Sequence, residues 1–382
     1  MTNPTATAIL TVAGLDALVD ALRARDFTVI GPTVRDGAVV HAEITGVADL
    51  PRGVGDEQDN AHYRLRKRDD EAVFGYTAPA QSWKSVLFPA RELLRGSRDD
   101  EPAQDGPYAL FGVRSCDLAA IAILDRVLTE RAAVDVHYAR RRAGTFVVAV
   151  ACTQPGGTCF CASTGTGPEP GTGYDLCLTE LLAGGHRFVV AVGSELGGQV
   201  LADVGSAPAR PEDLAAGSAA VAAAVDHMGR ALDTDGLRDL LYDNAEHPQW
   251  DDVATRCLAC TNCTLVCPTC FCTSVEDVSA LAAPPQRLRV WDSCFTTDFS
   301  YLHGGSVRGS TSARYRQWAT HKLAAWVDQF GTSGCVGCGR CISWCPAAID
   351  LTAEVAAIRA APRPVTGPRT AAGTTAPAGT KE

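Results

Sequence analysis

Two short stretches of the chain repeat one arrangement of cysteines. CLACTNCTLVCP covers residues 257–268, and CVGCGRCISWCP covers residues 335–346. In both, two, two and three residues separate successive cysteines, and a proline follows the last. Three cysteines so closely spaced can wrap around one corner of a compact iron–sulfur cluster, while the fourth ligates the other cluster of a pair. The spacing therefore predicts two [4Fe–4S] clusters.

The exchange of the fourth cysteine divides the eight ligands between the motifs. The expected sets are Cys257, Cys260, Cys263 and Cys345 for the first cluster, and Cys335, Cys338, Cys341 and Cys267 for the second. The motifs must then meet in space, so residues 268–334 form a loop that the clusters close. Gly337 and Gly339 suit a tight loop whose backbone passes close to a cluster.

Structural zinc is the alternative interpretation of these cysteines. Zinc sites generally use two separated pairs of ligands, often with histidine. Two complete four-cysteine runs that each end in Cys-Pro fit that pattern poorly. The alternative function of another class is accordingly a zinc-stabilised scaffold that assembles partners without carrying electrons.

Four further cysteines lie upstream, in FGVRSCDLAAI and ACTQPGGTCFCASTGTGP. They are Cys116, Cys152, Cys159 and Cys161, each beside an expected strand end or glycine-rich loop. Four thiolates could hold a third [4Fe–4S] cluster, and Asp117 could replace one of them because iron also accepts carboxylate. The alternative is that these cysteines pack as small buried residues. Their concentration in loops favours the cluster.

The remaining cysteines have no complete motif. Cys270 and Cys272 lie in CPTCFC, and Cys294 lies in WDSCF. We expect them to pack beside a cluster, where their sulfurs or nearby amides tune its potential. A fourth cluster that adds Cys177 is arithmetically possible, but Cys177 lies in the helix-like stretch YDLCLTELL and is assigned to packing.

Composition excludes several classes of function. The 382 residues are 46% hydrophobic and 20% charged, which is typical of a globular protein with two or three domains. A net charge of −10 without a basic run excludes nucleic acid and anionic membranes as main partners. The apolar runs are strand-sized and the N-terminus lacks a basic region, so we expect a cytoplasmic protein with no membrane contact. There, the sixteen cysteines favour metal or redox chemistry over disulfides.

The apolar pattern predicts an α+β fold. Strands are expected within 27–44 and at 71–78, 108–114, 145–152 and 187–193, and helices at 14–25, 117–130 and 175–184. These elements form a mixed α/β domain over residues 1–205. An Ala-rich helical linker (206–234), an α-helical ferredoxin-type domain (235–358) and a disordered tail (359–382) follow. Within the second domain, a helix at 312–330 places Trp318, Lys322 and Trp326 near one face.

Two other features carry weaker signals. The glycine-rich stretches 164–173 and 193–198 lack G-x-G-x-x-G after a strand and are expected to be surface loops. A local basic patch is either an ion-paired helix face or a region that raises a cluster potential or docks an acidic partner. Its members are His303, Arg308, Arg314, Arg316, His321 and Lys322. No Ser-His-Asp set, HExxH or P-loop is visible, so no catalytic residue is assigned.

Taken together, the motifs resemble those of a known family. The matching stretches are HYRLRKRDDEAVFGYTAPAQSWKSVLFP, FGVRSCDLAAI, CTQPGGTCFCASTGTGP, CLACTNCTLVCPTCFC, WDSCF, HGGSVRGSTSARYRQWATHKL and the second cysteine run. They occur in order over about residues 25–355. The chain resembles the β subunit of cytoplasmic four-subunit NiFe hydrogenases, also called sulfhydrogenases. The A subunit of anaerobic sulfite reductase belongs to the same wider family.

The resemblance implies an electron-transfer subunit that is not itself catalytic. It implies a partner subunit that binds FAD and NAD(P), and catalytic partners that are the small and large NiFe hydrogenase subunits or, alternatively, those of a sulfite reductase. Nothing in this chain resembles the paired Cys-x-x-Cys of a NiFe site, so hydrogen is not expected to be activated here. A one-electron relay beside a two-electron flavin is a sensible division of labour.

Overall fold

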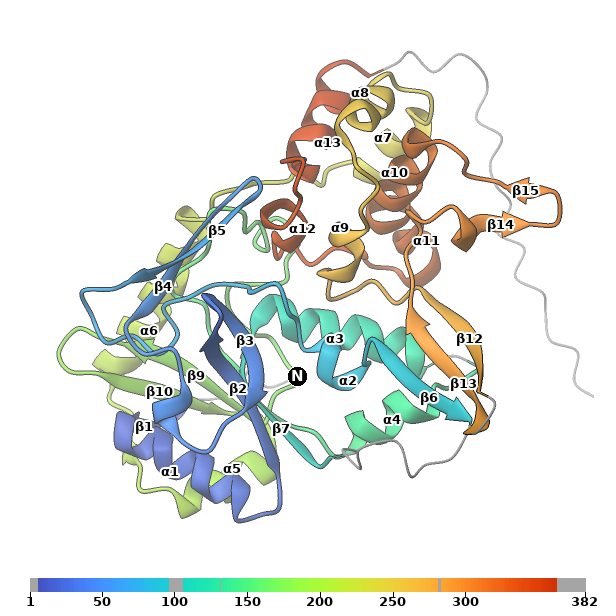
Figure 1. The fold of residues 1–382 in the computed structure, drawn as a ribbon. Helices are drawn as coiled ribbons and strands as arrows, with labels where there is room; N and C mark the ends of the chain where they lie inside the picture. Colours follow the sequence, from blue (N-terminus) through green and yellow to red (C-terminus); the bar gives the residue numbers. More distant parts are fainter. Residues whose placement is uncertain (1–5, 96–105, 131, 281–282, 363–382) are drawn as a thin grey trace, which may run out of the picture.

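A computed structural model describes residues 6–95, 106–130, 132–280 and 283–362 (Figure 1). A part built on a large sheet contains most of the N-terminal half, and a helical part contains most of the C-terminal half. The expected α+β class is confirmed. Within the described ranges, no helix has the length and apolar character needed to cross a membrane.

The large sheet has eight strands in the order β11-β1-β10-β9-β8-β7-β2-β3. Its strands are β1 (Ala6–Thr11), β2 (Thr28–Arg35), β3 (Ala38–Glu43), β7 (Tyr108–Arg114), β8 (Phe146–Val150), β9 (Leu176–Leu181), β10 (Arg187–Val192) and β11 (Ala207–Pro208). The four from β2 to β9 are parallel neighbours, and the pairs toward both edges are antiparallel. Parallel central strands are usually covered on both faces.

Helices cover both faces of this sheet. They are α1 (Val12–Arg23), α3 (Ser115–Leu128), α4 (Val136–Ala143), α5 (Glu195–Asp203) and α6 (Pro211–Asp226). One core joins α1 and α5 to alternate strand residues such as Phe111, and a second core joins α3 and α4 to the intervening residues such as Leu110. This alternation follows from the two-residue repeat of a strand.

Helix α6 lies in the stretch predicted to be a linker. It contacts β9 and β10, and Val221 is buried in the second core. An ideal Cβ at Gly217 would lie 3.5 Å from the Thr179 side chain. The Ala-rich helix therefore packs on the sheet, because its small residues allow a close approach to the strands.

Residues 71–78 form no strand, which corrects the prediction. Their backbone is instead satisfied by two buried side chains. Glu180 accepts hydrogen bonds from the backbone N–H groups of Val73 and Phe74, and Arg114 donates to the carbonyls of Phe74 and Tyr76. Buried backbone groups need partners, and here charged side chains supply what a neighbouring strand would otherwise supply.

The helix predicted at 175–184 is wrong, because these residues contain β9. Leu176 and Leu178 face the core under α1 and α5, whereas Cys177 faces the core under α3. A strand buried on both faces has a nearly continuous apolar run, which resembles a helical pattern over so few residues.

The helical part packs around an aromatic core. Its helices are α7 (Leu237–Asp243), α8 (Gln249–Arg256), α9 (Asn262–Leu265), α10 (Thr311–Thr320), the π-helical turn η4 (His321–Ala325), α11 (Trp326–Phe330), α12 (Arg340–Ser343) and α13 (Leu351–Ala360). Trp250, Tyr315 and Trp318 are buried together in this core. Residues 363–382, most of the predicted tail, lie outside the described residues.

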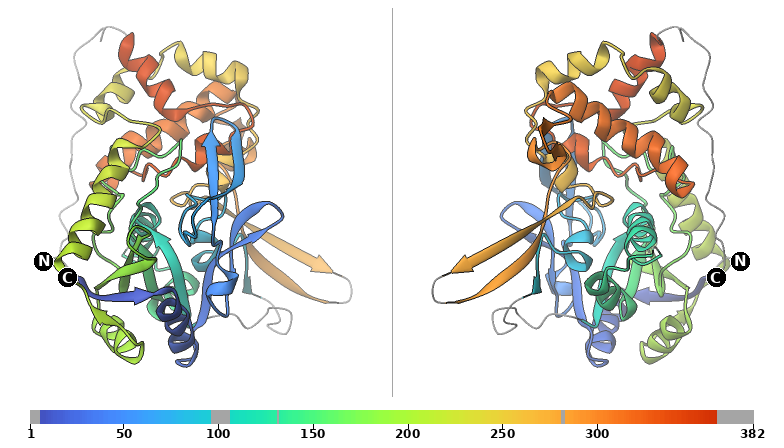
Figure 2. Two further views of the ribbon diagram at one scale, coloured as in Figure 1. Left: turned by 90° about the vertical axis from the view of Figure 1, so that its left-hand side faces the viewer. Right: turned by 90° about the vertical axis from the view of Figure 1, so that its right-hand side faces the viewer.

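Strands also occur within the range of the predicted α-helical ferredoxin-type domain. Strands β12 (Thr273–Ala280) and β13 (Ala283–Trp291) form a hairpin, and β13 pairs with β6 (Arg91–Arg95) of the N-terminal half. Figure 2 shows this hairpin extending away from the rest of the protein. The smaller elements are β4 (Val54–Asp59), β5 (His62–Lys67), β14 (Tyr301–Leu302), β15 (Gly305–Ser306), α2 (Lys84–Leu87), η1 (Val47–Asp49) and η3 (Asp298–Ser300).

The second cysteine motif lies against a loop of the N-terminal half. The Phe160 N–H donates to the Gly337 carbonyl at 2.8 Å. An ideal Cβ at Gly337 would lie 2.6 Å from backbone atoms of Phe160 and Cys161, and one at Gly339 would lie 2.3 Å from the Thr158 carbonyl oxygen. Both glycines also have positive φ, at 60° and 74°. The tight loop predicted there is confirmed, and the neighbour that requires glycine is the 158–161 backbone.

Replacing Gly337 by alanine is therefore expected to destabilise the contact between the two halves. Gly331→Ala is the matched control, because Gly331 has a φ of 69° but no atom near an added Cβ. The control should lose about 1–2 kcal/mol of unfolding free energy from the left-handed backbone alone. Gly337→Ala should lower the unfolding free energy by about 1–3 kcal/mol more than the control does, because its added methyl group overpacks the contact with residues 160 and 161. Thermal unfolding of the iron-loaded chains measures both, and equal losses would contradict the contact.

Candidate metal centres

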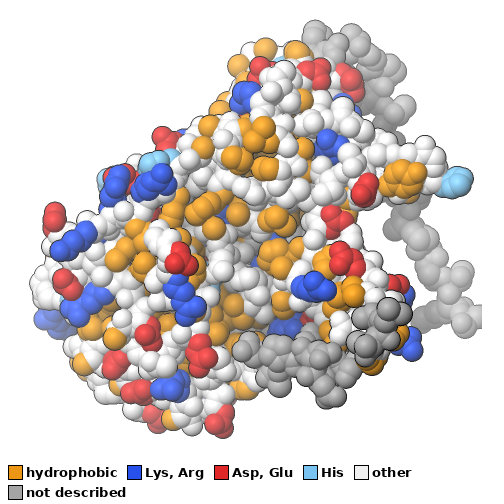
Figure 3. Space-filling model, viewed as in Figure 1, with side chains coloured by type: hydrophobic (Ala, Val, Ile, Leu, Met, Phe, Trp, Pro, Cys, Tyr) orange, Lys and Arg blue, Asp and Glu red, His pale blue; other side chains and the backbone are white. Residues whose placement is uncertain are grey.

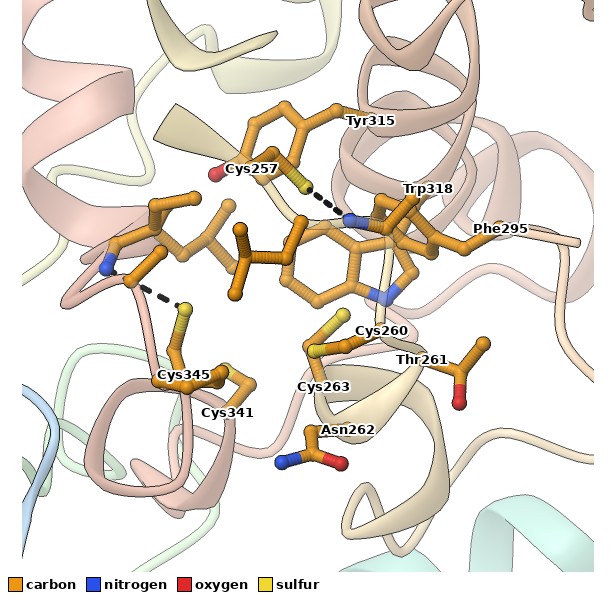
Figure 4. Close-up of a pocket in the computed structure, with 16 residues that line it drawn as sticks. Cys257, Cys260, Thr261, Asn262, Cys263, Phe295, Tyr315, Trp318, Cys341 and Cys345 are labelled. Carbon is orange, nitrogen blue, oxygen red and sulfur yellow. Dashed lines mark hydrogen bonds between the residues drawn. The ribbon is translucent and has the colours of Figure 1, made fainter. Parts of the chain in front are cut away.

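The first predicted ligand set surrounds one cavity. One cavity is lined by all four of its cysteines, Cys257, Cys260, Cys263 and Cys345. Their side chains point into this first cavity from α9, from the turn after α8 and from the loop before α13 (Figure 4). Burial raises the pKa of Cys263 well above its ordinary value, and the three other thiols of the set add to that rise. The two cysteine motifs therefore meet in space, as expected.

The walls of the first cavity are apolar and its sulfurs accept backbone hydrogen bonds. Phe295, Tyr315 and Trp318 line one side. The Ala259 N–H donates to Cys257 Sγ, and the Ile349 N–H donates to Cys345 Sγ, both at 3.4 Å. Hydrogen bonds to sulfur and limited solvent exposure are the means by which a protein tunes a cluster potential.

Both cysteine loops adopt the same backbone conformation. Thr261 has φ 70° and ψ −10°, and Gly339, at the same place in the second motif, has φ 74° and ψ −8°. Ala259 and Gly337 also correspond, with φ of 49° and 60°. A residue other than glycine in this region costs roughly 1–2 kcal/mol, so the first motif holds a strained shape that presents three sulfurs to one side.

The second predicted set is gathered in the interior. Cys267, Cys335 and Cys338 are buried. Burial raises the pKa of Cys341 well above its ordinary value, and the other thiols of the set raise it further because they are close. Lys322 Nζ donates to Cys267 Sγ at 3.0 Å, so a buried cation lies beside this set.

The third predicted set is also brought together. Cys116 lies in the first turn of α3, and Cys161 packs with it and with Cys338. Burial raises the pKa of Cys159 well above its ordinary value, and nearby Cys152 and Cys161 raise it further. The Gly156 N–H donates to Cys159 Sγ at 3.3 Å. The second and third sets therefore adjoin at the contact between the two halves of the chain.

Asp117 is not placed as a metal ligand, which corrects that alternative. Its carboxylate forms an ion pair with Arg340, with Oδ1 2.9 Å from Nη1 and Oδ2 2.9 Å from Nη2. Arg340 has no exposed surface and also donates to the Pro79 carbonyl. Asp117 instead connects α3 to the second cysteine loop.

The glycine-rich stretches serve packing. Ideal Cβ atoms at Gly193 and Gly197 would lie 2.2 and 2.1 Å from the carbonyl oxygens of Tyr174 and Asp175. A Cβ at Gly167 would lie 2.9 Å from Cys161 Sγ. Residues 164–173 therefore border the third cysteine set. Residues 193–198 pack closely against the backbone of Tyr174 and Asp175.

The predicted basic patch separates in the structure. Arg316 pairs with Glu246, Arg314 is buried, and His303 lies at the projecting β14–β15 turn (Figure 1). Three members line a second cavity of about 420 Å³ together with Trp318 and Trp326: Arg308, His321 and Lys322. The expected common face of Trp318, Lys322 and Trp326 is therefore present.

One buried cation near this cavity was missed. Lys84 is 3% exposed, and its Nζ donates to the Cys270 carbonyl at 3.0 Å and lies 3.8 Å from the centre of the Trp291 ring. The signal that could have identified it is a single lysine inside the otherwise apolar stretch SWKSVLFP, because a lysine is seldom fully buried without a partner.

The donor set fits iron–sulfur clusters in kind. Thiolates are the usual ligands of such clusters, and the four cysteines of the first set line one cavity. In the described part of the chain, no three His, Cys, Asp or Glu side chains converge tightly enough to hold one metal ion.

Removing the Asp117 carboxylate is expected to leave Arg340 as an unpaired buried charge. Asp117→Ala should therefore lower the unfolding free energy by about 3–5 kcal/mol. The control is Asp277→Ala, which breaks the exposed pair with Arg287 and should cost about 0–1 kcal/mol. Iron content measured alongside unfolding checks the role, because removal of a ligand would lower the iron content, whereas removal of the ion pair should leave it unchanged.

Comparison with known proteins agrees with this geometry. The description "4Fe-4S dicluster domain" matches residues 256–349. The β subunit of sulfhydrogenase 2 from Pyrococcus furiosus is 32% identical over 315 residues, which cover 79% of this chain and 90% of that protein. No solved structure is significantly similar. The chain therefore belongs to the sulfhydrogenase β-subunit family and is an iron–sulfur protein of the 4Fe–4S dicluster type.

Proposed function

We propose that this chain is the electron-relay subunit of a cytoplasmic NAD(P)-linked NiFe hydrogenase. It passes electrons between a partner that binds FAD and NAD(P) and the small and large hydrogenase subunits, and it supplies no catalytic residue. The observation that carries the proposal is the meeting of Cys345 with the first motif around one cavity. Such an exchange holds two clusters close together, as a relay requires. The name of the Pyrococcus relative supports the hydrogenase rather than the sulfite reductase complex.

We assign one proposed cluster to each of the three groups of cysteines described above. Two [4Fe–4S] clusters would be held by the eight cysteines of the two motifs, and a third by Cys116, Cys152, Cys159 and Cys161. When bound, these groups supply one-electron redox chemistry over a wide range of potentials. The protein contributes the sulfur ligands, the N–H groups that donate to them and the apolar walls that limit water.

The three proposed ligand sets differ in solvent exposure: the first set lies near the surface, and the second and third sets lie in the interior. Cys260 of the first set is exposed, and the neighbouring Leu258 is 67% exposed. By contrast, Cys335 and Cys338 are buried, as are Cys159 and Cys161. Apolar side chains gather on the helical part in the view of Figure 3. We therefore place the exchange of electrons with one partner at the first cavity, because an apolar rim with little charge suits protein docking.

Metal analysis tests which complex the chain serves. The complex is purified anaerobically through this subunit from its native host. Nickel together with iron is the expected result. Iron without nickel, especially with a sirohaem absorption band, would assign the chain to a sulfite reductase, and zinc alone would contradict the relay.

Serine substitutions test the ligand sets one at a time. Cys257→Ser, Cys335→Ser and Cys159→Ser are each expected to remove about four irons per chain and one set of paramagnetic signals, because each disrupts one [4Fe–4S] cluster. The control is Cys177→Ser, which lies in β9 away from the sets and should retain all iron. Iron analysis and electron paramagnetic resonance of the dithionite-reduced chain provide the readout. Unchanged iron in Cys159→Ser would remove the third cluster from the proposal.

A further inference from the structure

Three cysteines outside the proposed ligand sets converge on the second cavity. Cys270, Cys272 and Cys294 all line this space of about 420 Å³. Lys322 lines the same space, and its Nζ donates to Cys267 Sγ of the second ligand set at 3.0 Å. The three thiols therefore form one group beside the second ligand set.

The hairpin β12–β13 brings these cysteines together. Cys272 precedes β12 and Cys294 follows β13, and the register pairs Thr273 with Trp291 at the base of the hairpin. The Asp292 N–H then donates to the Cys272 carbonyl at 2.9 Å. Closure of the hairpin thus brings together Cys272 and Cys294, which flank its two strands.

Two buried ammonium groups lie next to the three thiols. Lys322 and Lys84 are 4% and 3% exposed. Lys322 Nζ donates to Cys267 Sγ and to Thr269 Oγ1, and Lys84 Nζ donates to backbone carbonyls of Leu265 and Cys270. In the part of the chain that the structure describes, neither has a carboxylate partner. Buried charges are normally paired, so the two ammonium groups favour anionic occupants on both sides of Lys322, at the second ligand set and at the second cavity.

The backbone around Lys322 is unusual as well. Lys322 lies in η4, a π-helical turn between α10 and α11. Such turns within helices are often found at functional sites. The turn aims Lys322 at the thiols, and it places His321 on the same cavity.

We propose that Cys270, Cys272 and Cys294 bind an additional iron–sulfur cluster through three thiolates, with one iron position facing the second cavity. A cluster of this kind is anionic, which matches the two ammonium groups, and the open cavity offers more room than a single zinc ion needs. The site adjoins the second ligand set through Cys267, so electrons could reach it. All three ligands belong to this chain, whichever complex it serves.

The double variant Cys272→Ser/Cys294→Ser tests the site in the full chain. Wild type and variant are loaded anaerobically with ferrous iron and sulfide. The variant is expected to contain about four fewer irons per chain, while the signals that Cys257→Ser removes stay in place and show that the fold is intact. Cys177→Ser is the matched control and should lose none. Equal iron in variant and wild type would overturn the proposal, as would loss of a single zinc ion. Absence of the Cys257-dependent signals would instead count against the relay.

Alkylation provides a readout that does not depend on iron counting. All three thiols line a cavity that a small reagent can enter. In the iron-loaded protein, iodoacetamide should leave Cys270, Cys272 and Cys294 unmodified, and it should modify them after a chelator removes the iron. Equal modification in both states would contradict ligation.

A potential measurement tests the role of the buried charge. Lys84→Met should move the reduction potential of the additional signal to more negative values, because a nearby cation favours the reduced and more negative form of a cluster. Lys67→Met, at an exposed position at the end of β5, is the control and should leave that potential unchanged. A potential that Lys84→Met leaves unmoved would contradict the pairing of this lysine with a cluster.

Discussion

The buried ion pair between Asp117 and Arg340 joins the two halves of the protein at their metal centres. Asp117 directly follows Cys116, and Arg340 lies between Cys338 and Cys341. One interaction therefore determines how a ligand of the third set lies relative to the second. Burying two charges costs several kcal/mol per ion unless the geometry is good and other hydrogen bonds are made. Arg340 Nη2 donates to Asp117 Oδ2, and Arg340 Nε donates to the Pro79 carbonyl, so these hydrogen bonds offset part of that cost.

The packing of the second cysteine loop against residues 158–161 explains why the second motif contains glycines at positions where the first does not. Gly337 and Gly339 lie under the 158–161 backbone, whereas Ala259 and Thr261 line a cavity that is open toward solvent. Both loops need the left-handed backbone to direct three sulfurs inward. Only the buried second loop must also leave space for the 158–161 backbone segment. Packing and ligand geometry together therefore decide the residue types.

Electrostatics in the interior are consistent with anionic occupants. Burial raises the pKa of Cys161 and Cys335 to about 12, so without a cation these thiols hold their protons at neutral pH. Metal ligation requires thiolates and releases those protons. Arg340, Lys322 and Lys84 are buried around the same region. Their positive charge lowers the free energy of a group that carries several thiolates, which a wholly apolar interior would not do.

Cysteine spacing alone predicted the meeting of the two motifs, because a cluster constrains its ligands more tightly than side-chain packing constrains a core. Local pattern failed where long-range contacts decide the outcome. Residues 71–78 have the composition of a strand, but Glu180 and Arg114 bind their backbone. The run around Cys177 is a strand because neighbours on both faces bury it. Asp117 has the chemistry of a ligand, and only its distance to Arg340 showed otherwise.

Residues 268–334 between the motifs have a structural role of their own. Closing a loop costs free energy that grows only slowly with its length, so a long insert is tolerated once both ends are held. Here the insert folds back twice. Its hairpin pairs with β6, which attaches the helical part to the N-terminal half, and α10 with η4 returns Lys322 to Cys267. The segment that separates the motifs in sequence thus supplies the cation that lies beside their ligands.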